Sequence, residues 1–493
     1  MKQSQRIVKN AVLGIAASVI GGLVYLATVL TIAHKVSVIE FGKYSFVLAF
    51  ALFFQLVADA GLPRMMIREI AKDPGQVGHL MGASAALIWV MSGAVCLLVA
   101  LIVPFLHFGV DVKIAALIMS FATLATFHSA GYSAVLRAFE DNELNYVGFI
   151  VQKILLLGFI FLAIRLKTGL IGFVTAHFVS NVLLWYFYHF VVAKFYARSK
   201  LLIDLPLWKS LIRSAIPMGG GVMLRQLALQ LDILVLTWMT NMTTVGLFSG
   251  PYRLSMALRI VPQTLALPIY PLYSRTAHLS PGRFGEVYRQ SLKFFIIFSI
   301  PFASFFIAWA QPILLLALGK KFLPALPAME WLGLGLIPFF LSTLFQYLFA
   351  ALDEQKKFLA STCVGSGLRI LLLVVLIYKF GFVGPSIAFA ASEIVIVGIW
   401  IVQLTGLGYP AHFVSLMWRP LAAGAAMSLL LYALRESPVI WQVGGAAMSL
   451  LIYLFGLLVL RTFSTEEIHQ AREGMAFVSP FVASWAKKLR RDS

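Results

Sequence analysis

Gly42-Lys43-Tyr44-Ser45 recurs as Gly246-Leu247-Phe248-Ser249, and this repetition decides how the rest of the chain is interpreted. Two more short matches follow in the same order, 153–157 (KILLL) with 369–373 (RILLL) and 169–172 (GLIG) with 381–384 (GFVG). The offsets are 204, 216 and 212 residues. Matches that keep their order and nearly their spacing indicate an internal duplication. Duplicated multi-helix units are common in membrane transporters, whose substrate sites lie where the two repeats meet.

The composition indicates an all-α polytopic membrane protein. Of 493 residues, 60% are hydrophobic and 12% charged, and the mean hydropathy is +0.91, well outside the range of a soluble domain. Apolar runs repeatedly reach the ~20 residues that cross a bilayer core. We predict fourteen spans, at 10–33, 43–62, 78–106, 114–136, 145–164, 170–192, 212–238, 245–268, 290–311, 328–350, 358–378, 383–405, 420–434 and 441–460.

The positive residues behind the net charge of +19 are distributed unevenly between the two sides of the predicted membrane bundle. When residues near the span ends are counted with the adjacent loops, 25 Lys and Arg lie on the side of the N-terminus, 9 lie on the other side, and the remaining 5 of the 39 lie deeper within spans. The positive-inside rule then places both termini in the cytoplasm, and the basic residues attract anionic membrane lipids. No nucleic-acid partner is needed to explain the charge. Cys96 and Cys363 lie inside spans and are interpreted as packing residues, not as a disulfide or metal pair.

The duplication predicts parallel repeats, because six spans per repeat return the chain to the side where it started. The last two spans lie outside the duplication. In the tail, Phe477, Phe481 and Trp485 precede a basic run, which suits an interfacial helix. The predicted units are an N-terminal six-helix lobe at 1–206, a C-terminal six-helix lobe at 207–406, two extra transmembrane helices at 407–462 and a cytoplasmic amphipathic tail at 463–493.

Several short stretches carry a further signal: 37–45 (SVIEFGKYS), 59–62 (DAGL) with Arg64 and Arg68, Asp232 with 245–249 (VGLFS), 252–254 (YRL), 319–322 (GKKF) and 378–384 (YKFGFVG). In this order they resemble polysaccharide repeat-unit (O-antigen) flippases of the multidrug/oligosaccharidyl-lipid/polysaccharide exporter superfamily. The resemblance covers 1–406 and implies a V-shaped, two-lobed bundle in the bacterial inner membrane. Such a bundle moves undecaprenyl-diphosphate-linked oligosaccharide to the periplasmic leaflet by alternating access.

The resemblance also implies partners, with a monomer as the expected state. Besides the lipid-linked oligosaccharide and membrane lipids, a polysaccharide polymerase and chain-length machinery are candidate partners. A lipid II-type flippase and a cation-coupled multidrug exporter remain alternatives. A membrane glycosyltransferase or polymerase is disfavoured, because the outer loops are short and no nucleophile-elbow, Walker or metal-ligand spacing occurs. We therefore expect no enzyme activity, cofactor or metal.

The candidate site residues are cations within the spans. The diphosphate head of a lipid-linked sugar must cross a region where charge is costly, so the cavity needs inward-facing cations. Arginine suits phosphate because its planar fork donates two hydrogen bonds. Outward snorkelling, pairing with a carboxylate or a shared architectural role is the alternative for each. The candidates are Arg225, Arg259, Arg253, Lys153 and Arg369, with Gln226, Gln230 and Arg64 as polar cavity candidates.

The embedded acids Asp232, Glu393 and Asp59 are candidates for binding a coupling proton or sodium ion. Asp232 follows Arg225 by two helical turns, so the two side chains are expected on one face of a helix, where they could share one cavity wall. Compensation of a nearby arginine charge is the alternative role, and whether transport is coupled at all stays open. Pro262 is a candidate hinge in the eighth span.

Overall fold

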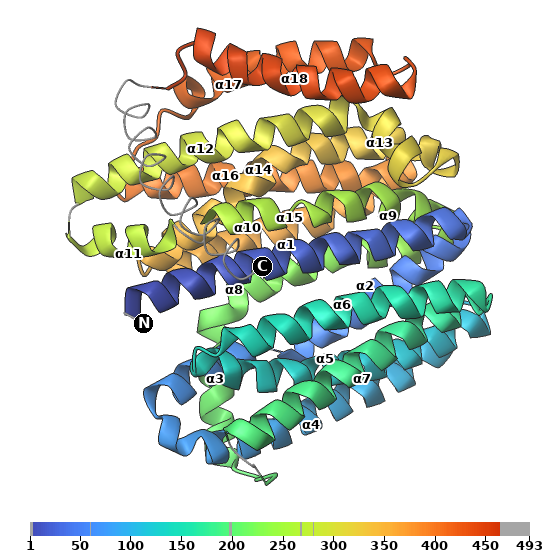
Figure 1. Cartoon of the computed structure of the whole chain (residues 1–493), viewed down its shortest axis with the longest axis vertical. Coiled ribbons are helices and arrows are strands. Elements are labelled where there is room, and N and C mark those ends of the chain that lie inside the picture. Colours follow the sequence, from blue (N-terminus) through green and yellow to red (C-terminus); the bar gives the residue numbers. More distant parts are fainter. Residues whose placement is uncertain (1–2, 60, 197–199, 267–268, 280, 464–493) are drawn as a thin grey trace, which may run out of the picture.

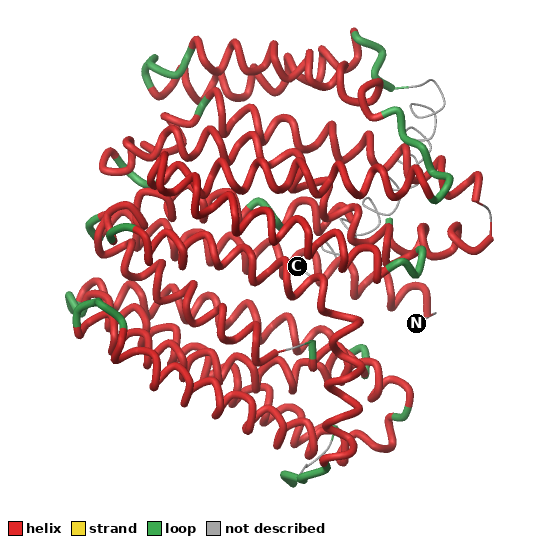
Figure 2. Tube along the Cα trace, turned by 180° about the vertical axis from the view of Figure 1, so that it is seen from behind, coloured by secondary structure: helices red, strands yellow, loops and turns green. Residues whose placement is uncertain are grey.

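The computed structural model describes residues 3–59, 61–196, 200–266, 269–279 and 281–463, and within these ranges the chain forms helices and no β-strand (Figure 2). The predicted all-α membrane architecture is confirmed. Twelve segments are long and apolar enough to cross a membrane, and one of them, at 355–406, contains two successive helices. The predicted amphipathic tail with Phe477, Phe481 and Trp485 lies outside the described residues.

Each of the fourteen predicted spans corresponds to a helix or a broken helix. The first six spans and their connections form α1 (Gln3–Lys35), α2 (Val38–Asp59), α3 (Leu62–Lys72), α4 (Val77–Ile102), α5 (Val110–Ala138), α6 (Asn142–Arg165) and α7 (Gly169–Phe195). The remainder forms α8 (Leu205–Met239), α9 (Met242–Ala257), α10 (Ile260–Ala266), α11 (Tyr270–Leu279), α12 (Pro281–Ala308), α13 (Ala310–Ala317), η3 (Lys320–Ala325), α14 (Leu326–Ala351), α15 (Gln355–Phe380), α16 (Gly384–Gly406), α17 (Phe413–Ala433) and α18 (Val439–Val459).

The eighth span, in which Pro262 is the candidate hinge, is a broken helix. It divides into α9 and α10 at Leu258 and Arg259. There the backbone amide of Leu258 donates to the carbonyl of Ser255, and that of Arg259 donates to the carbonyl of Met256. Pro262 explains the position of the break, because a proline ring clashes with the carbonyl four residues earlier and donates no hydrogen bond. The bend therefore falls one turn before Pro262, at Arg259.

Two predicted boundaries are also corrected. The thirteenth span, predicted at 420–434, begins earlier, since α17 starts at Phe413 and is 21 residues long. Pro420 lies inside this helix, and the polar residues Ser415 and Arg419 before it concealed its start. The second span ends with α2 at Asp59, where the prediction had placed the span end at 62.

The helix packing repeats along the chain. In the first part α1 packs against α6, α2 against α5, α4 against α5, and α7 against both α5 and α6. The same arrangement recurs with α8 against α15, α9 and α12 against α14, and α16 against both α14 and α15. Figure 1 shows the second set above the first, with α1 between them and with α17 and α18 outermost, where α17 packs on α12.

The duplicated motif places two glycines at the crossing of α2 and α9. A Cβ on Gly42 would lie 2.0 Å from the carbonyl oxygen of Met242, and one on Gly246 would lie 2.1 Å from that of Val38. Each glycine thus packs against the backbone four residues before its counterpart, as a pseudo-twofold relation requires. The repeated sequence therefore forms a close backbone contact between the two sets of helices.

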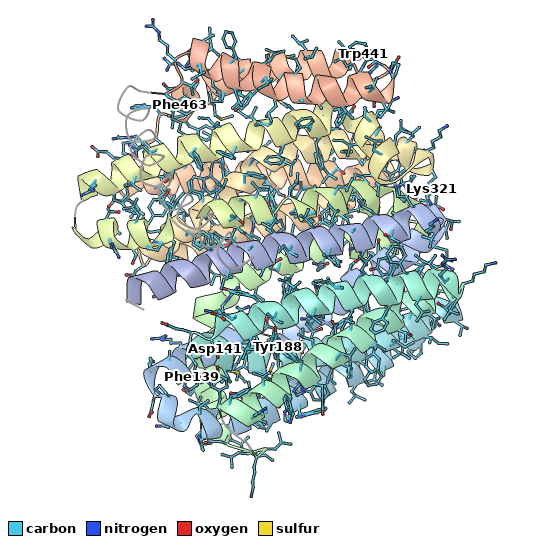
Figure 3. The ribbon with its side chains drawn as sticks, viewed as in Figure 1. Phe139, Asp141, Tyr188, Lys321, Trp441 and Phe463 are labelled. Carbon is cyan, nitrogen blue, oxygen red and sulfur yellow. The ribbon has the colours of Figure 1, made fainter. Side chains whose placement is uncertain are left out.

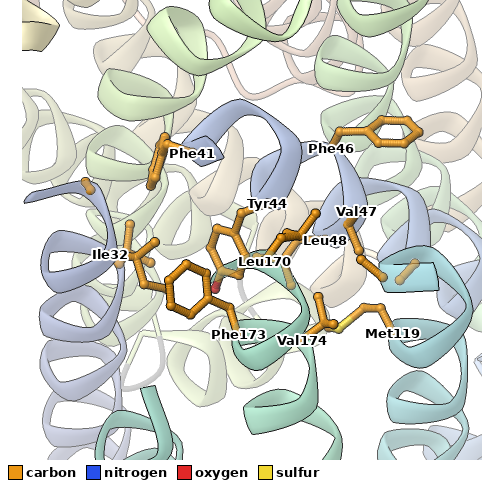
Figure 4. Packing of buried hydrophobic residues seen from close by; sticks show 14 of the residues in the cluster. Ile32, Phe41, Tyr44, Phe46, Val47, Leu48, Met119, Leu170, Phe173 and Val174 are labelled. Carbon is orange, nitrogen blue, oxygen red and sulfur yellow. The ribbon is translucent and has the colours of Figure 1, made fainter. Parts of the chain in front are cut away.

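An apolar core surrounds this crossing and draws on both sets of helices. Phe41 and Tyr44 of α2 are fully buried, and Tyr44 packs edge-on against Phe173 of α7 (Figure 4). Phe322 of η3 also belongs to this core and meets Phe41 with the ring centroids 5.5 Å apart. The crossing end of the bundle is thus closed by packed side chains.

Candidate functional site

A cavity of about 500 Å³ lies between the two sets of helices, beyond the α2–α9 crossing. Residues of α1, α2 and α6 line one side, and residues of α8, α9 and α10 line the other. This is the place where a duplicated transporter is expected to hold its substrate. The polar and aromatic lining residues include Tyr25, Lys153, Gln230, Arg253, Arg259 and Gln263.

Arg253 reaches across the cavity from α9 to the first set of helices. Its Nε donates to Ser45 Oγ at 3.3 Å, and its Nη1 lies 3.5 Å from the hydroxyl of Tyr25. The guanidinium carbon lies 5.6 Å from the centre of the Tyr44 ring. These neighbours are neutral, so they hold the guanidinium in place without cancelling its charge.

Arg259 and Lys153 bring two more positive charges to the same cavity. Arg259 sits at the break before α10 and donates from Nη1 to Gln226 Oε1 at 3.0 Å. The ammonium of Lys153 on α6 lies 5.2 Å from the ring centre of Tyr25 and 5.3 Å from that of Phe149. Cation–π contacts of this kind position a cation while leaving its charge available to a ligand.

The cavity is therefore cationic. Among the described residues that line it, Lys153, Arg253 and Arg259 carry charge and no aspartate or glutamate is present. Charge in a site of low dielectric is costly unless it is paired, so three cations without a carboxylate favour an anionic ligand. Gln230 of α8 adds neutral hydrogen-bonding groups to the lining.

Two of the five candidate cations belong to a separate, buried ion-pair network. Arg369 of α15 binds both carboxylate oxygens of Asp232 on α8, with its Nε 2.9 Å from Oδ1. Neither side chain is among the cavity-lining residues, and Asp232 has no exposed surface. Arg225 of α8 forms the second pair, with its Nη2 2.7 Å from Glu393 Oε2 on α16.

The two pairs are joined to each other. Arg369 Nη1 lies 3.8 Å from Glu393 Oε1, and Arg225 also donates to Ser342 of α14 at 2.5 Å. We call Arg225, Asp232, Arg369 and Glu393 the buried quartet. It carries two positive and two negative charges and connects α8, α14, α15 and α16. Asp232 and Arg225 thus contribute to one network, but none of its four residues lines the cavity.

Arg64 and Asp59 lie elsewhere. Arg64 is exposed on α3 and does not line the cavity. Asp59 ends α2, and one of its buried carboxylate oxygens has no hydrogen-bond partner in the described part of the chain. Burial raises the pKa of Asp59 to about 6, and the positive charge of Arg64 partly opposes this shift.

Sequence analysis missed the aromatic residues that hold the cations. Tyr25, Tyr44 and Phe149 contact Lys153 or Arg253. Nothing in the sequence separates Tyr25 and Phe149 from the other aromatic residues of the spans. Tyr44 alone carried a signal, since it belongs to the duplicated motif. Its hydroxyl lies 2.9 Å from His177 Nε2, and this hydrogen bond holds the Tyr44 ring in position beside Arg253.

No group of three or more His, Cys, Asp or Glu side chains suited to a metal ion occurs among the described residues. Cys96 and Cys363 are free thiols that do not pair with each other. The site offers a ligand cations, hydroxyls and amides, and these groups bind and orient.

Solved structures share this fold. A lipid II flippase, MurJ, in an inward closed conformation matches with a TM-score of 0.70 at 14% identity, over 92% of this chain and 99% of the flippase chain. An inward-facing multidrug resistance MATE-family transporter matches with a TM-score of 0.64 at 14% identity, over 81% and 99%. At these identities the likeness establishes the fold.

A further solved structure is a transporter of the same superfamily from Pyrococcus furiosus. It matches with a TM-score of 0.57 at 14% identity, over 81% of this chain and 96% of that one, and is described as having a binding pocket of reverse polarity. No curated protein matches this sequence significantly. The family model described as polysaccharide biosynthesis protein matches residues 7–277, more than half of the chain. The chain belongs to this polysaccharide biosynthesis protein family.

Proposed function

We propose that this protein flips undecaprenyl-diphosphate-linked oligosaccharide repeat units from the cytoplasmic to the outer leaflet by alternating access. The observation that carries the proposal is the cavity with Lys153, Arg253 and Arg259 and no acidic residue among its described lining. A diphosphate diester carries two negative charges and four terminal oxygens, which guanidinium groups bind through paired hydrogen bonds. Phosphate oxygens can replace the neutral hydroxyl, amide and aromatic groups that these cations contact in this structure.

The three cations have separate roles in this proposal. Arg253 and Arg259 come from α9 and from the turn before α10, so both reach the cavity from the second set of helices. Lys153 faces them from α6 of the first set. A diphosphate bound between them would contact both sets at once. In this proposal Gln230, which lines the cavity, binds sugar hydroxyls, and Gln226 orients the guanidinium of Arg259.

We further propose that the buried quartet is a fixed internal counter-ion network. Each of its carboxylates already has a guanidinium partner, so Asp232 and Glu393 serve Arg369 and Arg225 and do not exchange a coupling ion. Asp232→Asn tests this in proteoliposomes with an imposed pH gradient. Flipping by the correctly folded variant should respond to the gradient as the wild type does. A response lost only in the variant would assign Asp232 to coupling instead.

The orientation of the chain follows from its charges. Both termini face the cytoplasm of a bacterial cell in this proposal, so the end with the α2–α9 crossing faces outward. The cavity is then closed toward the outside in this conformation. The two six-helix lobes, 1–206 and 207–406, would rock against each other around the cavity to expose it to the other side.

Export of surface polysaccharide in cells tests the substrate assignment. Lys153→Ala, Arg253→Ala and Arg259→Ala should each abolish export while membrane abundance stays near the wild-type level. Lysine at either arginine position should restore it only partly, because a point charge replaces a bidentate fork. Arg165→Ala is the matched control, since Arg165 is exposed at the end of the same helix as Lys153. Full export by all three alanine variants would refute the proposal.

A lipid II-type flippase is the second candidate, because the shared fold includes a lipid II flippase and lipid II carries the same diphosphate linkage. Complementation separates the two. This chain should restore surface polysaccharide in a strain that lacks its own repeat-unit flippase, and it should fail to support growth in a strain that lacks its lipid II flippase. A cation-coupled multidrug exporter is less favoured, since cationic drugs would meet three cations in this cavity.

A further inference from the structure

Lys321 joins the two sets of helices at the closed end of the bundle. It lies in η3, at the end of the molecule opposite Asp141 (Figure 3). Its ammonium donates to the backbone carbonyls of His34, at 3.0 Å, and Val36. These carbonyls belong to the C-terminal end of α1, 287 and 285 residues away along the chain.

The contact has a simple physical basis. The last carbonyls of a helix have no intrahelical partner, and the negative end of the helix dipole attracts a cation. Lys321 supplies both the donor and the charge. Gly319 allows the approach, because its φ of +89° turns the chain between α13 and η3 into a conformation that favours glycine.

Other contacts lie beside it and join the same two parts. The ring of His34 lies 3.3 Å from the carbonyl of Leu316 on α13, and Phe41 of α2 packs edge-on against Phe322. The glycine crossing of α2 and α9 is part of the same apolar core. The closed end thus has a packed inner layer and an outer polar contact.

We propose that Lys321 is a releasable latch that holds this end closed, and that its release accompanies opening of the cavity there. The inference rests on the alternating access of the proposed function. The buried quartet provides the contrast, because its arginines are paired with the buried carboxylates of Asp232 and Glu393 and so suit a permanent link. Lys321 is partly exposed, and its partners are neutral carbonyls. Water can hydrogen-bond to the ammonium and to the carbonyls when they separate, so the link is reversible.

The latch is tested by a reporter under the closed end. Ser249 is fully buried on α9 between Gly246 and Arg253, and its hydroxyl has no partner among the described residues. Ser249→Cys in a protein with Cys96→Ala and Cys363→Ala therefore adds one shielded thiol. Its rate of reaction with a water-soluble maleimide, in nanodiscs, measures how often this region opens.

Lys321→Met keeps the length of the side chain and removes its donors and charge. It should speed labelling of the reporter by roughly five- to thirtyfold, the factor expected when one or two net hydrogen bonds are lost. Lys320→Met is the matched control, since Lys320 is exposed beside it, and should not change the rate. Lys321→Arg should behave as the wild type. Equal rates for Lys321→Met and Lys320→Met would overturn the latch.

A second experiment covers failure of Lys321→Met to fold. A bifunctional thiol reagent that links Val36→Cys to Lys321→Cys should stop transport, and unlinked protein should transport. Transport by fully linked protein would overturn the proposal. The labelling rate requires no substrate, whereas the cavity variants test diphosphate recognition. Faster labelling in Lys321→Met without diphosphate binding in the cavity would retain the latch and reject the proposed substrate. An unchanged labelling rate together with diphosphate binding would reject the latch alone.

Discussion

Lys153 and Arg369 occupy equivalent positions in the repeat, but their partners differ. Both lie on helices that pack equivalently, α6 against α1 and α15 against α8. Lys153 meets the Tyr25 ring on α1, whereas Arg369 meets the Asp232 carboxylate on α8. An aromatic partner leaves a positive charge available to a ligand, and a carboxylate cancels it. The choice of partner thus makes one of the two cations a candidate for binding and the other a candidate for structure.

Removing one member of the buried quartet should destabilise the protein strongly. Arg369→Ala leaves the Asp232 carboxylate buried without its counter-ion, which costs about 3–5 kcal/mol. The double variant Arg369→Met with Asp232→Leu removes both charges and should recover most of the lost stability. Thermal unfolding of the purified protein, followed together with folded yield, measures this difference. A double variant less stable than Arg369→Ala would contradict the fixed counter-ion role.

Asp59 should make stability depend on pH. Its folded-state pKa of about 6 lies above the ordinary aspartate value of 3.8, so the folded protein binds this proton more tightly than the unfolded chain. Its contribution to stability is present at low pH and is lost as pH rises through about 6. Asp59→Asn should therefore raise the melting temperature at pH 7.5, by roughly 1 °C per kcal/mol of penalty relieved in a chain of this length, and change it less at pH 5. Equal shifts at both values would place the titration elsewhere.

At the scale of elements, helix existence followed from apolar run length, while breaks and ends depended on local details. The spans were predictable because a bilayer requires about 20 apolar residues in each. Pro262 predicted a bend in the eighth span, but the position of the break at Arg259 depends on which carbonyl its ring displaces. The candidate site was predictable as a set of residue types. The division of these residues between the cavity and the buried quartet was not predictable, because whether a cation meets Tyr25 or Asp232 depends on helix packing between distant segments.

The α2–α9 crossing should not tolerate a side chain. Gly42→Ala would place a Cβ against the Met242 backbone, which has no freedom to move aside, so the closed end should pack less well. We expect faster labelling of the Ser249→Cys reporter and a large loss of export. Gly93→Ala is the matched control, because a Cβ there meets nothing within 4 Å. A wild-type labelling rate in Gly42→Ala would show that this contact does not hold the end closed.

At the scale of the whole molecule, charge distribution predicts the orientation in the membrane. With 25 of 39 Lys and Arg assigned to the side of the N-terminus, reporters fused at residue 493 should show cytoplasmic activity. Reporters inserted near Lys35 and Lys320 should show periplasmic activity. A periplasmic C-terminal fusion would contradict the even number of spans, and with it the parallel relation of the two repeats.

The central claim is that the cavity cations bind a diphosphate, and direct binding tests it without requiring transport. Farnesyl diphosphate serves as a soluble probe, titrated by calorimetry into the purified full-length protein in nanodiscs. Arg253→Gln and Arg259→Gln should each raise Kd by about 10- to 100-fold, since a hydrogen bond to a charged group contributes about 1.5–3 kcal/mol. Arg165→Gln should leave Kd unchanged. Wild-type affinity in both cavity variants would contradict the claim.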